Sequence, residues 1–154
     1  MDGWVTNLLF GVAMFLLLGL SIGLQIFRTR RAPLGRVVAL LKAIKHNQKL
    51  VEDFSYSRDI AKFKTGSWER YREKLVFLPQ ELRTEMTRLC DIVIDINTRI
   101  DEARRHQSDS YMAAIEVDKL KAPMDNCRMQ LEEWIMANMN NPDYLPKKRS
   151  LFKR

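Results

Sequence analysis

The chain has 154 residues, 46% of them hydrophobic, and a formal net charge of +7. Its two cysteines argue against a small secreted domain held together by disulfides, and its excess of Lys and Arg favours anionic partners. The roughly 127 residues that follow an amino-terminal apolar run suffice for one compact domain, and the sequence contains no recognisable internal repeat.

An uncharged run over residues 3–27 is followed at once by Arg28, Arg30 and Arg31. As a helix with ~1.5 Å per residue it would reach roughly 37 Å, enough to cross a hydrocarbon core of about 30 Å. A cleaved signal peptide would carry basic residues ahead of a shorter apolar core, whereas the only charge ahead of this run is Asp2. We therefore predict a single transmembrane anchor over residues 1–31, with the amino terminus outside and the rest of the chain in the cytoplasm.

Small residues recur at multiples of four within this anchor, at Gly11, Gly19 and Gly23. Such a stripe lets another helix approach closely, so it predicts helix packing in the membrane, against a second copy or a different protein. The same spacing also arises by chance in membrane helices.

Residues 32–54 are predicted to form a juxtamembrane amphipathic helix that begins at Pro33, where the missing N–H would have no partner in any case. The apolar residues of one face are Leu34, Val37, Leu41, Ile44 and Val51. This helix either packs into the domain or lies on the membrane surface, and the two arrangements are compatible.

Two clusters of basic residues flank the predicted domain. Between residues 28 and 49 there is no acidic residue, and the basic ones are Arg28, Arg30, Arg31, Arg36, Lys42, Lys45 and Lys49. The tail, residues 141–154, ends in a second cluster that includes Lys147, Lys148 and Arg149. We predict that both contact anionic lipid headgroups, the alternative being solvated segments that only set membrane topology. Nucleic acid is not expected as a partner, because no recognition motif accompanies the charge.

Residues 55–140 are predicted to form a helical bundle. After a polar connection over residues 55–66, apolar residues return at helical spacing, and Pro79 should kink or restart this short segment. A seam with coiled-coil spacing then follows. Its residues are Leu82, Met86, Leu89, Val93, Ile96, Ile100 and Ala103.

The seam breaks near residues 107–110, where Ser108 or Asp109 should cap a new helix. This second helix is expected to run without interruption to about residue 140, with Pro123 kinking it but leaving its face unchanged. Its apolar residues are Ala113, Val117, Leu120, Met124, Cys127, Leu131 and Trp134.

The fold class that follows is all-α: a transmembrane helix, a juxtamembrane helix, and an antiparallel helical hairpin or small bundle. A short break should fold the two long helices back on each other, which places Cys90 and Cys127 at the same level. A parallel homodimer is the alternative, since seams of this kind also allow self-association.

No motif for catalysis or for cofactor binding is present: the sequence lacks a phosphate-binding glycine loop, HExxH and GxSxG. Asp91 and Asp95 lie one helical turn apart, but the Glu-x-x-His motif of helical-bundle metal sites is missing. Asn141-Pro-Asp-Tyr144 matches an NPxY-type docking peptide, but a proline-containing helix terminator is the simpler explanation. We predict a protein that is not an enzyme and needs no cofactor.

We predict a membrane-tethered scaffold or adaptor that presents a cytosolic helical bundle to other proteins. The main alternative is an accessory subunit of a larger membrane complex, which should leave an apolar stripe uncovered along Trp68, Tyr71, Leu75 and Phe77. A third hypothesis is an anionic-lipid-binding protein. Charge reversal at Lys42, Lys45 and Lys49 would then abolish liposome binding.

Overall fold

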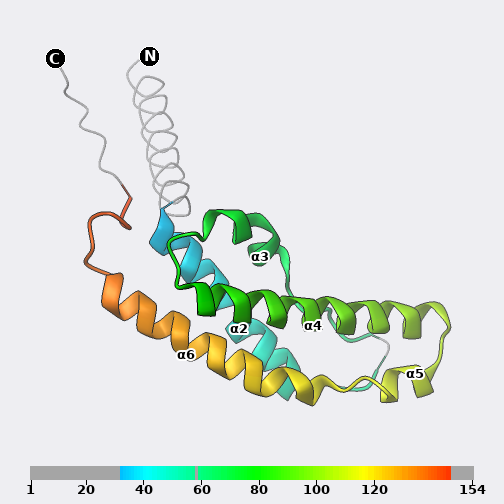
Figure 1. Ribbon diagram of the computed structural model, residues 1–154. Helices are drawn as coiled ribbons and strands as arrows, with labels where there is room; N and C mark the ends of the chain where they lie inside the picture. The colour runs from blue at the N-terminus through cyan, green and yellow to red at the C-terminus, as the bar shows by residue number, and fades with distance from the viewer. Residues whose placement is uncertain (1–31, 58, 147–154) are drawn as a thin grey trace, which may run out of the picture.

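The computed structural model describes residues 32–57 and 59–146, and this part of the chain is all-helical (Figure 1). In chain order the elements are α2 (Pro33–Glu52), α3 (Gly66–Tyr71), η1 (Arg72–Lys74), α4 (Gln80–Arg105), α5 (Asp109–Ala113), η2 (Val117–Leu120) and α6 (Lys121–Asn138), where η marks a 3₁₀ helix. None of these helices combines the length and the apolar character that a membrane span requires. The predicted anchor over residues 1–31 lies outside the described residues.

Helix α2 begins at Pro33, as the sequence predicts, and it packs into the bundle. Its buried residues recur at spacings of three and four, which is the pattern of one helical face. They are Val37, Leu40, Ile44, Asn47 and Val51. The predicted face was partly wrong, because Leu34 and Leu41 are only partly buried while Leu40 and Asn47 occupy the core.

Helix α4 has the most regular apolar pattern, and every residue of its predicted seam is buried. Cys90 is buried alongside that seam, while Pro79 stands immediately before the helix. Proline is tolerated at the start of a helix because the N–H groups there have no acceptor within the helix, so its missing N–H costs no hydrogen bond.

Helix α4 ends in a Schellman motif. The Ser108 N–H donates to the Ala103 carbonyl at 3.0 Å, and the Gln107 N–H donates to the Arg104 carbonyl at 3.2 Å. Gln107 has a positive φ of 48°, the left-handed conformation that this motif requires and that glycine adopts most readily. Ser108 then caps α5 as predicted, since its side chain accepts the Tyr111 N–H.

The prediction of one continuous helix after this turn was wrong. Helix α5 ends at Ala113, and α6 begins only at Lys121. Pro123 is the reason: within a helix its ring would clash with the carbonyl of Lys119, so it is tolerated in the first turn of α6 instead of at a mid-helix kink. The shift leaves Ala113 exposed, and Met112 is buried in its place.

Helix α6 runs antiparallel to α2 and α4 (Figure 1). The pairs between α2 and α6 follow this direction: Lys45 meets Glu132, and Gln48, further along α2, meets Asp125, which lies earlier in α6. From α4, Glu85 accepts hydrogen bonds from Asn126 and Gln130 of α6. The predicted antiparallel pairing of the two long segments is therefore present within one chain.

The connection between α2 and α3 is held by two asparagine side chains. Asn47 of α2 donates to the Lys64 carbonyl at 2.9 Å and accepts the Lys64 N–H at 2.7 Å. Asn97 of α4 does the same for the neighbouring Phe63, with both distances 2.9 Å. Each amide thus satisfies a donor and an acceptor that no strand or helix pairs, and Phe63 is buried beneath them.

The apolar stripe that an accessory subunit should leave open is covered. Trp68 and Leu75 are buried, and Tyr71 and Phe77 are partly buried against the same core. The described bundle thus closes over its own apolar residues.

Candidate functional site

One end of the bundle is closed by the rings of Phe77, Trp134 and Tyr144, and we call it the aromatic end. The ring centroids lie 5.4 Å apart for Phe77 and Trp134, 5.1 Å for Trp134 and Tyr144, and 5.7 Å for Phe77 and Tyr144. Aromatic pairs at such distances stabilise a fold by ~0.5–1.5 kcal/mol each beyond their burial. The cluster therefore fastens the segment after α6 to the bundle.

A turn over residues 141–144 positions Tyr144. The Asn141 side chain accepts the Asp143 N–H at 3.0 Å, and the Tyr144 N–H donates to the Asn141 carbonyl at 3.1 Å. The Tyr144 carbonyl in turn accepts the Leu34 N–H at 3.2 Å, one of the amides at the start of α2 that has no partner within its own helix. The NPxY-like sequence thus has a structural role, and its tyrosine is partly buried.

Both ends of the described chain lie at the aromatic end (Figure 1). The two predicted basic clusters continue from these ends, since Arg31 is bonded to Ala32 and Lys147 to Pro146. Several predicted site residues lie outside the described part of the chain: Gly11, Gly19, Gly23, Arg28, Arg30, Arg31, Lys147, Lys148 and Arg149.

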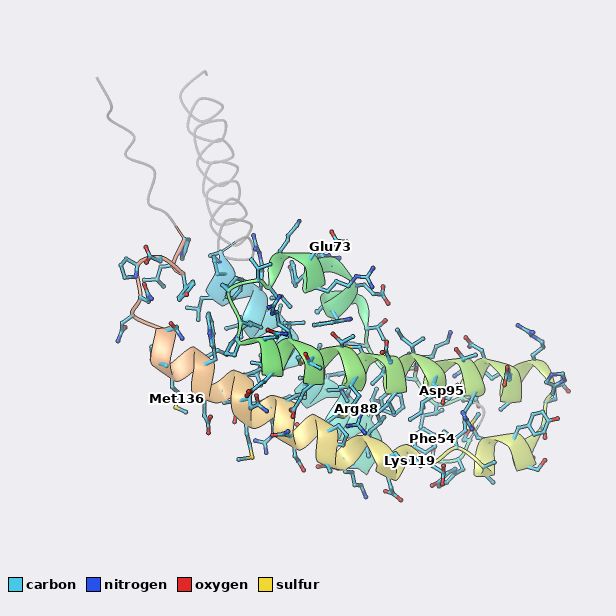
Figure 2. The ribbon with its side chains drawn as sticks, viewed as in Figure 1. Phe54, Glu73, Arg88, Asp95, Lys119 and Met136 are labelled. Carbon is cyan, nitrogen blue, oxygen red and sulfur yellow. The ribbon has the colours of Figure 1, made fainter. Side chains whose placement is uncertain are left out.

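Basic side chains of the described residues also lie at this end. Arg36 in the first turns of α2 donates from Nη1 to the Lys74 carbonyl at 3.2 Å, which ties η1 to α2. Arg72 and Lys74 are exposed, and so is Glu73 between them, which projects from this end in Figure 2. Val76 follows with 74% of its surface exposed, the highest value among the exposed large apolar residues of the described chain.

The predicted basic face of α2 is only partly free. Lys45 forms a 2.7 Å ion pair with Glu132 of α6, and this hydrogen bond holds the pKa of the Glu132 carboxyl below its usual range. Lys42 and Lys49 are exposed. Lys45, which was predicted to contact lipid, therefore already has an acidic partner within the bundle.

The two thiols are buried between α4 and α6. Burial raises the pKa of Cys90 to about 12, with a further contribution from the charge of Cys127. Burial likewise raises the pKa of Cys127 to about 11, and the Glu85 carboxylate adds to the effect. Both side chains belong to the same hydrophobic core. Both are poor nucleophiles at neutral pH, because the thiolate is the reactive form.

A depression lies at the opposite end, beside α5. It is an open hollow of about 770 Å³ lined by Ser57, Asp59, Arg104, Gln107 and Asp109. Among the residues that the structure describes, no group of three or more His, Cys, Asp and Glu side chains is placed to hold a metal ion.

Comparison with protein-family models, with curated proteins and with solved structures gives no match. A function has to be inferred from the residues and their geometry. The aromatic end is the strongest candidate site, because exposed basic side chains, an exposed aliphatic residue and both chain ends lie together there.

Proposed function

We propose that this protein is a non-enzymatic, single-pass membrane adaptor whose helical bundle stands in the cytoplasm and binds other proteins. The tether is the uncharged run over residues 3–27 with its following arginines. The observation that carries the proposal is the arrangement of the bundle: both described chain ends lie at the aromatic end, so the rest of the bundle extends away from the point at which a tether would enter.

The closed core favours an adaptor over an accessory subunit. A subunit that caps a larger complex should expose a contiguous apolar stripe, but Trp68 and Leu75 are buried at the place where this stripe was expected. The exposed large apolar residues of the described chain include Met129, Met136 and Met139, which recur at seven- and three-residue spacing along α6 and its carboxyl-terminal cap and offer a surface to a partner. A bundle that satisfies its own core is suited to reversible contacts with soluble partners.

The experiment is to extract the full-length protein from its native membrane in mild detergent and to determine the mass and composition of what accompanies it. Recovery alone, as a homo-oligomer, or with substoichiometric soluble proteins supports the adaptor. A stoichiometric set of other membrane subunits contradicts it and favours the accessory-subunit hypothesis. Membranes from cells that lack the protein provide the control, and recovery in the soluble fraction without detergent would contradict the tether itself.

A further inference from the structure

Residues 72–78, which comprise η1 and the connection to α4 and are called the loop below, expose most of their side chains at the aromatic end. Arg72, Lys74 and Val76 are exposed, whereas Leu75 and Leu78 are buried in the core. The buried leucines anchor the loop, so Val76 is held on the outside by its neighbours. An exposed aliphatic side chain that follows two exposed basic ones in the chain suits a partner with both an apolar and an anionic part, such as the interface of a bilayer.

The position of this loop indicates what covers it. The Arg36 contact with the Lys74 carbonyl and the Leu34 contact with the Tyr144 carbonyl hold the loop and both described chain ends at the aromatic end. From Phe27, the last residue of the uncharged run, to Ala32 is five residues, which span at most about 18 Å when fully extended. In a tethered protein the aromatic end is therefore the part of the bundle nearest the bilayer.

We propose that the loop over residues 72–78 is a membrane-contacting site, in which Val76 enters the interface of the bilayer and Arg72 and Lys74 bind the phosphates of anionic phospholipids. This inference rests on the proposed membrane tether. It differs from the lipid contacts predicted from sequence, because these three residues belong to neither of the basic clusters that flank the bundle.

The chemistry of the surrounding residues fits an interface. Trp and Tyr side chains favour the headgroup level of a membrane, and Trp134 and Tyr144 lie beside this loop through their contacts with Phe77. Exposed carboxylates on or near this segment, those of Glu69, Glu73, Glu81 and Asp143, oppose the attraction. Within residues 72–78, Arg72 and Lys74 stand against the single carboxylate of Glu73, so this segment itself has a net charge of +1.

The test places a fluorophore on the loop of the full-length protein. Val76→Cys is labelled with an environment-sensitive maleimide, the buried Cys90 and Cys127 remaining unlabelled, and the protein is reconstituted into nanodiscs that contain spin-labelled phosphatidylserine or phosphatidylcholine. The matched control is Ile94→Cys, another exposed β-branched residue, on α4. We expect a blue-shifted label that spin-labelled lipids quench at residue 76, and an unquenched label at residue 94. Equal behaviour at the two positions overturns the inference.

The two basic residues are tested with the same fluorophore at residue 76, in the same nanodiscs. Arg72→Gln combined with Lys74→Gln should weaken the preference for phosphatidylserine over phosphatidylcholine by about 25-fold, since each basic residue near an anionic surface contributes about fivefold. Lys119→Gln with Lys121→Gln, exposed residues near α5, should leave that preference unchanged. Equal effects of the two pairs, or displacement of the lipid by a duplex oligonucleotide, overturn the lipid assignment.

The outcomes also separate this site from the tether. A protein that enters nanodiscs but keeps residue 76 in water retains the proposed function and loses the membrane-contacting loop. A protein that does not enter nanodiscs contradicts the tether, and with it the loop.

Discussion

Replacing Asn47 by alanine tests whether side-chain amides hold the connection before α3. The change removes two hydrogen bonds, of 2.9 and 2.7 Å, from the backbone of Lys64. Asn47 is only 4% exposed, but Lys64 itself is exposed, so water can reach the backbone groups that are released. At about 1 kcal/mol for each hydrogen bond, we expect the free energy of unfolding to fall by about 2 kcal/mol.

The assay is urea unfolding of the full-length protein in mild non-ionic detergent, followed by tryptophan fluorescence and circular dichroism. Asn140→Ala, at an exposed position beyond α6, is the matched control and should change the free energy of unfolding by no more than about 0.5 kcal/mol. Asn47→Asp keeps the acceptor for the Lys64 N–H but buries a carboxylate that faces the Lys64 carbonyl oxygen, so we expect it to be no more stable than Asn47→Ala.

A second asparagine sharpens the test. Asn97→Ala should cost a similar amount, and the double variant should cost less than the two single changes together, because Phe63 and Lys64 are adjacent and release of one loosens the other. Asn47→Ala with the stability of the control variant would refute the reasoning, as would strict additivity of two large effects.

Three further outcomes follow from the structure. Gln107→Gly should raise the free energy of unfolding by roughly 0.5–1 kcal/mol, because glycine adopts the left-handed conformation at this helix end without a steric penalty. Tyr144→Ala should lower it by about 2 kcal/mol through the loss of two ring contacts, whereas Tyr144→Phe keeps those rings and should change it little. The free energy of unfolding should also fall as the pH rises from about 9 to 12, because folding raises the pKa of Cys90 to about 12 and of Cys127 to about 11 from an ordinary value of 9.0, and the unfolded chain loses these protons first.

Each of these has a result that contradicts it. A lower free energy of unfolding for Gln107→Gly would show that contacts of the glutamine side chain stabilise the fold by more than its left-handed backbone conformation destabilises it. Equal losses for the alanine and phenylalanine variants of Tyr144 would assign the effect to its hydroxyl. An alkaline transition that is unchanged when Cys90 and Cys127 are both replaced by alanine would mean that other groups cause it.

Periodic apolar spacing predicted much of the fold. The seam of α4 is buried throughout, because a helix with one buried face has apolar residues at three- and four-residue spacing. Helix α2 starts at Pro33, because proline is favoured at the first helical position. The same reasoning failed after Ser108. There the apolar pattern continued in register across Pro123, so spacing alone did not reveal that the backbone leaves the helix between Ala113 and Lys121.

The candidate site was predicted less well than the fold. Burial of Asn47 depends on a backbone partner far along the chain, and no local pattern encodes such a partner. The exposure of Val76 depends on how Leu75 and Leu78 turn into the core, which is decided by tertiary packing. The basic flanks were recognisable, but their attachment to one end became apparent only through the contact between Leu34 and Tyr144.

The length of α4 sets the distance between the aromatic end and anything bound near α5. Its 26 residues at ~1.5 Å each extend about 39 Å from the aromatic end to the turn before α5. In a tethered protein this makes the bundle a spacer. Partners that bind beside α5 would then lie about this far from the point at which the tether enters.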